Sequence, residues 1–128
     1  METDRRTRKR KIGDAGEDAA CKLLDREGYS VLLRNFSCKI GEIDIIAIDG
    51  RRNILAFIEV KTRRNTDFGL PCQAVDREKQ HKMRRCAEVF LLRNRRFTML
   101  QPSLDIIEVL HTDKGIFARH IKNAFGEV

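Results

Sequence analysis

The chain has 128 residues, 35% of them charged and 41% hydrophobic, which is typical of a single globular domain. Its longest uncharged apolar run spans residues 54–58, far short of the roughly 20 residues that cross a bilayer. A formal net charge of +7 points towards a polyanionic partner. We expect no signal peptide, no membrane partner and a cytoplasmic protein.

The positive charge is concentrated at the start of the chain, where residues 1–11 hold six basic side chains against two acidic ones. We predict that residues 1–12 form a flexible basic arm ahead of one domain at 13–128. Such an arm contacts phosphates in some proteins and is only solvated in others, and the composition favours neither role.

Helix and strand signals then alternate along the chain. Asp14 is suited to cap a helix that runs to about Glu27, where Gly28 is a natural stop. Asp76 is suited to cap a second helix that runs to about Arg93. Strands are predicted at 29–36, 42–49, 54–61, 104–110 and 116–121, with turns at 50–53 and 112–115. The order αβββαββ predicts an α/β fold in which helices flank one central mixed β-sheet.

Two of these strands carry charged residues among apolar ones. Strand 42–49 has apolar residues on both faces, the pattern of a central strand covered on both sides, and it contains Asp44. In strand 54–61, Glu59 and Lys61 lie two residues apart and therefore project from the same face. Burying ionised groups is unfavourable unless they are paired or bound to a metal, so these residues indicate a functional site.

The hairpin loop between these strands sets how the charged side chains meet. With four loop residues at 50–53, Asp49 would pair with Ile54. Five steps further along the ladder, the same register brings Asp44 opposite Glu59. Two carboxylates at that spacing repel each other unless a cation lies between them or one is protonated. Mg²⁺, or Mn²⁺ in its place, is the expected cation, because a hard ion takes oxygen ligands and keeps waters for substrate.

Lys61 would lie beside this ion, where a lysine orients the attacking water or holds the phosphate under attack. The alternative is a structural ion pair between Lys61 and one of the two acids. A second acid on the same face leaves negative charge that such a pair does not neutralise, which favours the metal site.

Other candidate residues carry weaker signals. Glu17 lies near the start of the first helix, where acids are common because they favour the helix dipole. Lys79 and Gln80 lie at the start of the second helix, whose N-terminus is suited to hold a phosphate. Basic side chains near the site are expected to contact a nucleic-acid backbone without sequence preference: Arg63, Arg64, Lys79 and Lys82.

The four cysteines are scattered and form no Cys-x-x-Cys pair, which favours reduced thiols over a zinc site. Cys21 and Cys86 lie on apolar helical stripes, where filling the core is the expected role. No phosphate-cradling glycine loop and no serine nucleophile elbow are present, which disfavours nucleotide hydrolases and acyl transferases.

Six segments make the chain similar to the YraN-like family of small bacterial proteins, over nearly all of residues 13–125. They are 16–17, 41–47, 57–63, 74–76 with 79–80, 104–109 and 123–125, and the second and third are the most specific. That family is assigned to the restriction-endonuclease-like superfamily, whose nucleases carry a PD-(D/E)XK pattern and resemble Holliday-junction resolvases. The resemblance therefore implies a restriction-endonuclease-like core.

The resemblance also implies roles for particular residues. Asp44 and Glu59 correspond to metal ligands, and Lys61 corresponds to the catalytic lysine. Glu17 is raised as a further catalytic acid near the metal, and Gln80 as a further site residue.

Two features depart from the superfamily's sequence-specific nucleases. Ile43 stands where the PD-(D/E)XK pattern has proline, at a position that varies within the superfamily. The chain also has no insertion that would form a base-reading element, so binding through the DNA backbone is expected.

The leading hypothesis is a Mg²⁺-dependent endonuclease that hydrolyses phosphodiester bonds in DNA, including branched or otherwise structured DNA, and acts as a homodimer. A non-catalytic nucleic-acid-binding protein is the first alternative. The second is an interaction protein in a DNA repair or recombination assembly. Fold alone does not decide among them, because fold and function separate readily.

Overall fold

The structure, a computed structural model, describes the backbone of residues 5–64 and 76–125, and the side chains of 15–64 and 76–125. The helices are α1 (Arg5–Arg26) and α2 (Arg77–Arg93), the latter followed by a 3-10 turn, η2 (Arg95–Phe97). The strands are β1 (Ser30–Ser37), β2 (Glu42–Asp49), β3 (Ile54–Arg64), β4 (Gln101–Thr112) and β5 (Gly115–Ile121). The predicted order αβββαββ is confirmed.

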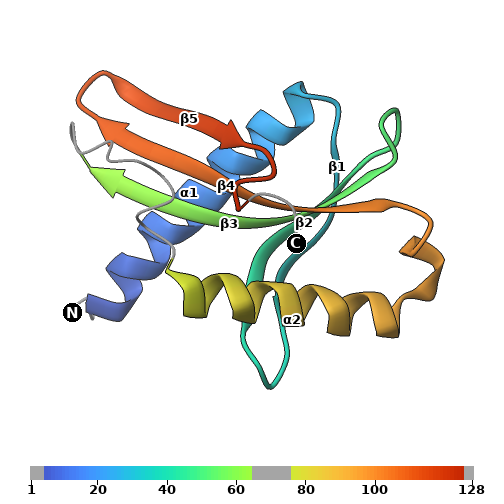
Figure 1. Cartoon of the computed structure of the whole chain (residues 1–128). Helices are drawn as coiled ribbons and strands as arrows, with labels where there is room; N and C mark the ends of the chain where they lie inside the picture. The colour runs from blue at the N-terminus through green and yellow to red at the C-terminus, as the bar shows by residue number, and fades with distance from the viewer. Residues whose placement is uncertain (1–4, 65–75, 126–128) are drawn as a thin grey trace.

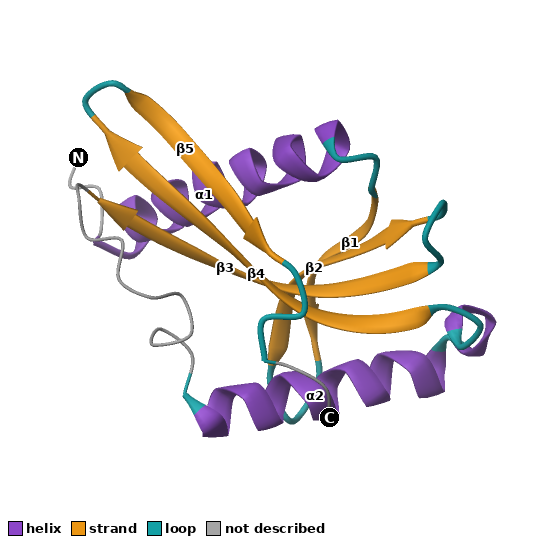
Figure 2. Ribbon diagram, turned by 45° about the horizontal axis from the view of Figure 1, so that its top comes forward, coloured by secondary structure: helices purple, strands orange, loops and turns teal. Residues whose placement is uncertain are grey.

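The five strands form one mixed sheet in the order β1-β2-β3-β4-β5. Neighbouring strands are antiparallel except β3 and β4, which run parallel. Parallel neighbours need a long crossover connection, and α2 lies within the one that joins β3 to β4. Figures 1 and 2 show a strongly twisted sheet with α1 and α2 on opposite faces. This is the predicted α/β architecture, consistent with a restriction-endonuclease-like core.

Each helix buries an apolar stripe against its own face of the sheet. Ala20 and Leu24 of α1 pack in one buried cluster with Ile58 of β3. Phe90 of α2 packs in the other with Phe57, the residue before Ile58 on the same strand. Because successive strand residues point to opposite faces, β3 is buried on both sides. So is β2, with Ile45 in one cluster and Ile46 in the other, as predicted for strand 42–49.

The ends of several elements differ from those predicted. α1 begins at Arg5 rather than near Asp14, so the predicted start of this helix is wrong. Arginine and lysine are good helix formers, and neither glycine nor proline interrupts residues 5–12, which explains the earlier start. The division of the chain into a flexible arm and a domain remains a prediction.

β3 extends to Arg64, three residues past its predicted end, because its pairing with β4 continues to Arg64↔His111. Residues 65–75, which follow it, lie outside the described residues. The start of α2 agrees with prediction, since Asp76 accepts a hydrogen bond from the backbone N–H of Lys79 at 2.8 Å. Neither described helix has a stretch long and apolar enough to cross a membrane.

Candidate metal centre

The centre lies where β2 and β3 separate. Their ladder has the predicted register, from Asp49↔Ile54 as far as Ile45↔Ile58. One step further, Asp44 turns its carboxylate towards the neighbouring strand, and Oδ2 accepts a hydrogen bond from the backbone N–H of Val60 at 2.8 Å. The carboxylate of Asp44 thus takes the place that a backbone carbonyl would have in the ladder. This hydrogen bond holds Asp44 beside Val60, the residue after Glu59.

Glu59 is the most enclosed residue of the centre, with 5% of its side chain exposed. Its Oε1 lies 3.4 Å from Nζ of Lys61 and 3.0 Å from Nζ of Lys79. Its other oxygen, Oε2, is buried and has no hydrogen-bond partner among the described residues. A buried carboxylate oxygen without a partner is rare in native proteins and calls for an explanation such as an ion.

The charge of this pair of acids is only partly compensated. Burial, the neighbouring charge of Glu59 and a side-chain hydrogen bond with Glu59 raise the pKa of Asp44 from 3.8 to about 7, against the lowering effect of the Val60 N–H. Burial opposes the charged form of Lys79, but its hydrogen bond to Glu59 and the charge of that residue raise the pKa of Lys79 overall. The arrangement therefore favours a further positive charge beside Asp44.

The donor set fits a hard divalent cation. Asp44 and Glu59 offer carboxylate oxygens from two adjacent strands, and Oε2 of Glu59 has no hydrogen-bond partner among the side chains described. Within residues 15–64 and 76–125, no group of three or more His, Cys, Asp or Glu side chains is placed to hold a metal. Two carboxylates match Mg²⁺, which is usually held by one or two carboxylates and keeps several waters. They do not match a closed zinc site, which takes four nitrogen or sulfur ligands.

α1 brings a third acid towards the pair. At Gly16 the helix approaches β3 so closely that a Cβ atom would collide with Oγ1 of Thr62. The next residue, Glu17, lies near enough for its charge to contribute to the raised pKa of Asp44. Its Oε1 is also 3.5 Å from Nη2 of Arg34. Glu17 is thus close to the centre and paired with an arginine of β1, and its role as a further catalytic acid stays a prediction.

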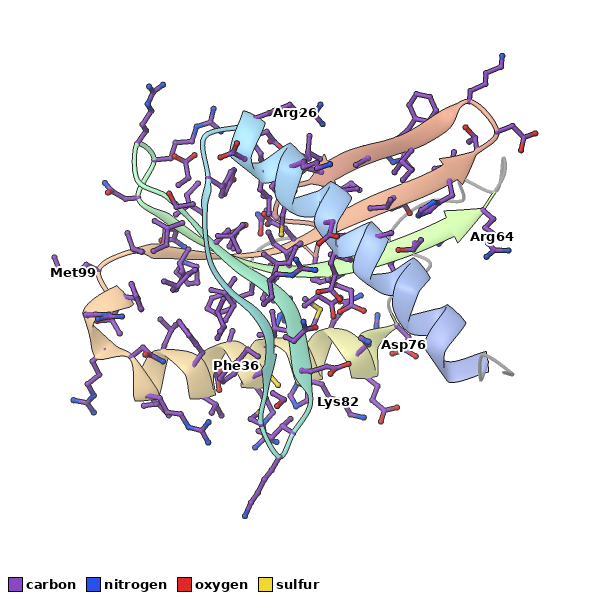
Figure 3. All side chains as sticks on the ribbon, turned by 180° about the vertical axis from the view of Figure 1, so that it is seen from behind. Arg26, Phe36, Arg64, Asp76, Lys82 and Met99 are labelled. Carbon is purple, nitrogen blue, oxygen red and sulfur yellow. The ribbon has the colours of Figure 1, made fainter. Side chains whose placement is uncertain are left out.

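The residues expected to bind nucleic acid have different surroundings in the structure. Lys79 faces Glu59 and belongs to the centre itself. Lys82 is half-exposed and pairs with Glu78 on its own helix at 3.4 Å. Arg64 is exposed at the end of β3, where Figure 3 labels it. Gln80 is half-buried in the first turn of α2, beside Lys79.

Sequence reasoning missed Glu108, a fully buried acid on β4 next to the centre. It pairs in register with Lys61, and residues paired across parallel strands share a face of the sheet. Arg119 of β5 donates two hydrogen bonds to Oε2 of Glu108, at 3.1 and 2.8 Å, and Arg63 lies 3.9 Å from Oε1. A signal was present, because Glu108 stands among apolar residues just as Asp44 does.

A second missed cluster lies on the α1 face of the sheet. His120 is nearly buried, with Nε2 2.7 Å from Oδ2 of Asp105 and Nδ1 3.1 Å from Oε1 of Glu27. Each ring nitrogen therefore has a carboxylate oxygen as its partner. The cluster joins the end of α1 to β4 and β5, which is a structural role.

Comparison with known proteins places the chain in a family. Residues 16–109 match the uncharacterised protein family UPF0102. The chain belongs to this family. UPF0102 is the family of the YraN-like proteins, so the match confirms the resemblance found in the sequence.

Relatives in the family match the chain over nearly its whole length. A UPF0102 protein of Caldanaerobacter subterraneus is 44% identical over 124 residues, which cover 94% of this chain and 99% of the relative. A UPF0102 protein of Caldicellulosiruptor saccharolyticus is 42% identical, covering 91% of this chain and 98% of the relative. A third, from Desulforamulus reducens, is 41% identical, covering 88% and 93%. The Asp44–Glu59 centre lies within the matched family region.

Proposed function

We propose that this UPF0102 protein is a metal-dependent endonuclease that hydrolyses phosphodiester bonds in DNA. The observation that carries the proposal is the pair of Asp44 and Glu59, two enclosed carboxylates from adjacent strands with two lysines beside them. Oε2 of Glu59, which has no hydrogen-bond partner in the part of the chain that the structure describes, and the raised pKa of Asp44 both favour a bound cation. Mg²⁺ fits this donor set, and Mn²⁺ has the same preference for oxygen ligands.

The protein's own residues supply the rest of the chemistry. Phosphodiester hydrolysis at such a centre draws on the cation for neutralising charge and activating water. Asp44 and Glu59 would hold that cation. The ammonium group of Lys61, on the same strand face as Glu59, would orient the attacking water and stabilise the negative charge that develops on the phosphoryl oxygens. Lys79 adds a second positive charge, which offsets the repulsion between the acids and an approaching phosphate.

Basic segments meet at the end of the molecule that holds the centre. In Figures 1 and 3 the N-terminal ends of α1 and α2 lie at the same end as the last residues of β3. Residues 5–11 at the start of α1 include six of the 26 lysines and arginines, and β3 ends in Arg63 and Arg64. Phosphate contacts from such groups give affinity without sequence preference, which suits branched or structured DNA. A homodimer would provide two cutting sites for such a substrate.

The test is cleavage of duplex, single-stranded and four-way-junction DNA with Mg²⁺, with Mn²⁺ and with chelator. Wild type is expected to give metal-dependent products, and Asp44→Asn and Lys61→Ala to give none. Lys61→Ala should bind DNA with nearly unchanged affinity, because it removes one charge among many. Asp49→Asn is the matched control, since Asp49 is also a buried acid of β2 but accepts hydrogen bonds from the Arg51 and Arg52 backbone in the hairpin.

Cleavage by Lys61→Ala at the wild-type rate would remove the role assigned to this lysine. The absence of products from every DNA form, with salt-sensitive binding that ignores both Mg²⁺ and Asp44→Asn, would identify a non-catalytic binding protein instead. Failure to bind any DNA or RNA at low salt would favour an interaction protein.

A further inference from the structure

Two cysteines that are far apart in the sequence meet where the β1–β2 hairpin contacts α2. Cys38 lies in the turn after β1 and Cys86 in the middle of α2, and their Sγ atoms are 3.2 Å apart. Both are free thiols, Cys38 partly exposed and Cys86 buried. The separation exceeds the disulfide bond length by little more than about 1 Å, since that bond is about 2.05 Å long.

Packing fixes this approach from both sides. The turn is closed by hydrogen bonds between the backbones of Cys38 and Gly41, with Cys38 N–H donating at 2.9 Å and Gly41 N–H at 3.3 Å. A Cβ atom at Gly41 would lie only 3.6 Å from Sγ of Cys86 and 3.9 Å from Cβ of Lys82, so the turn rests directly on α2. Figure 3 shows the end of the hairpin crossing this helix near Lys82.

Apolar side chains next to the turn hold the same contact. Phe36, Cys38 and Ile40 all pack against the buried cluster that contains Cys86 and Phe90. The rings of Phe36 and Phe90 meet edge to face, with centroids 5.4 Å apart. The two thiols are therefore held together by the fold rather than by the chance position of a surface loop.

The two thiols also differ in reactivity. The hydrogen bond from Cys86 lowers the pKa of Cys38, although slight burial opposes this effect. Burial and the contact with Cys38 raise the pKa of Cys86 to about 12. The thiolate is the reactive form of cysteine, so Cys38 is the expected nucleophile and Cys86 the residue that resolves its oxidised product.

We propose that Cys38 and Cys86 are a site of reversible oxidation, at which a hydroperoxide converts the two thiols into an intramolecular disulfide. The Cys38 thiolate attacks one peroxide oxygen, the O–O bond breaks, and a sulfenic acid forms while the departing oxygen takes up a proton. The Cys86 sulfur then attacks the sulfenic sulfur, the S–O bond breaks, and water leaves with the Cys86 proton. Two thiols and one hydrogen peroxide thus give one disulfide and two waters, and a dithiol reductant reverses the change.

The disulfide would close a loop from residue 38 to residue 86. This loop contains Asp44 and Glu59, together with both lysines of the candidate centre, Lys61 and Lys79. Oxidation would fasten β2, which carries Asp44, to α2, which carries Lys79. The proposal stands on the thiol geometry and does not depend on nuclease activity.

The sequence makes the test direct, because each cysteine falls in a different tryptic peptide. The peptides are 12–22 for Cys21, 35–39 for Cys38, 65–77 for Cys72 and 86–93 for Cys86. Native full-length protein is treated with hydrogen peroxide, alkylated under denaturing conditions, digested without reduction and analysed by mass spectrometry. The expected product is peptide 35–39 joined to 86–93, two hydrogens lighter than their sum, with the other two cysteines alkylated.

Two variants and one physical measurement sharpen the outcome. In Cys86→Ser, Cys38 should accumulate as a sulfenic acid that dimedone traps, whereas Cys21→Ser should form the disulfide as wild type does. The oxidised wild type should show a higher Tm, which dithiothreitol returns to its original value. Joined peptides other than 35–39 with 86–93 would overturn the proposal. So would full alkylation of Cys38 and Cys86 in wild type at a peroxide dose that gives sulfenic acid in Cys86→Ser.

Discussion

Replacing Asp44 by asparagine is expected to stabilise the protein above pH 8 in the presence of chelator, although it removes the residue on which metal binding depends. Asp44 is ionised there beside Glu59, and the two buried charges repel each other. The amide of asparagine has the shape of a protonated aspartate. Its oxygen accepts the hydrogen bond of the Val60 N–H, and its NH₂ group donates towards Glu59.

The magnitude follows from the pKa of Asp44 in the folded protein. A value raised from 3.8 to about 7 corresponds to about 4 kcal/mol, as an upper bound. Between pH 4 and 7 the folded protein holds this proton more tightly than the unfolded chain does. The free energy of unfolding therefore falls as pH rises through that window. The gain from Asp44→Asn should be near zero below pH 4 and reach about 2–4 kcal/mol above pH 8.

The measurement is urea unfolding of wild type, Asp44→Asn and the control Asp49→Asn between pH 4 and 8.5. The difference between wild type and Asp44→Asn isolates the carboxyl, because other titrating groups are common to both proteins. Asp49→Asn should show no such gain, since Asp49 accepts hydrogen bonds from two backbone N–H groups of the hairpin. A saturating concentration of Mg²⁺ at 100 times its Kd should stabilise wild type by about 2.7 kcal/mol and leave Asp44→Asn unchanged.

The two proteins could instead differ in free energy of unfolding by the same amount at every pH. That result would refute the reasoning, because it would mean that folding does not raise the pKa of Asp44. Destabilisation by Asp44→Asn at pH 8.5 would have the same consequence. Such destabilisation would mean that Asp44 forms a favourable structural ion pair rather than part of a cation-binding site.

Two further substitutions test the packing that positions the centre and the cluster on the opposite face. Gly16→Ala should lower the free energy of unfolding by about 1–3 kcal/mol, because its Cβ would collide with Thr62, and adding Thr62→Ala should restore most of the loss. His120→Ala should lower it by about 3 kcal/mol, because the buried Oδ2 of Asp105 loses its hydrogen-bond partner. Urea unfolding at pH 7 measures both, and a loss below about 1 kcal/mol for either variant would contradict its explanation.

The proximity of the two acids was predictable because it is determined locally. Four residues in the β2–β3 loop fix the partner of Asp49, and the ladder then carries that register to Ile45↔Ile58. What the register does not reveal is that the ladder stops one residue before Asp44 would pair with Glu59. The end of the ladder depends on how the two twisted strands separate, and the sequence of either strand alone does not determine this separation.

The position of Lys79 was not predictable in the same way. It lies on a helix joined to β3 through residues 65–75, and its approach to Glu59 depends on how α2 packs across the sheet. Helical periodicity identifies the buried face of α2 through Met83 and Phe90, but it does not say which strand residue the first turn will meet. Sequence reasoning consequently assigned Lys79 to a phosphate contact.

Lys79 bears directly on the choice between a metal centre and a structural ion cluster. Counted by charge alone, Lys61 and Lys79 balance Asp44 and Glu59, so the excess of negative charge expected from the sequence is removed. The positive charges are unevenly distributed between the two acids, because both ammonium groups contact Oε1 of Glu59. Neither forms an ion pair with Asp44 among the described residues, and Oε2 of Glu59 has no hydrogen-bond partner there. A cluster that served only the fold would gain by placing one lysine between the two acids. An Asp44 without an ion pair and an Oε2 without a hydrogen-bond partner, within the described residues, are the arrangement expected of a site that binds a cation.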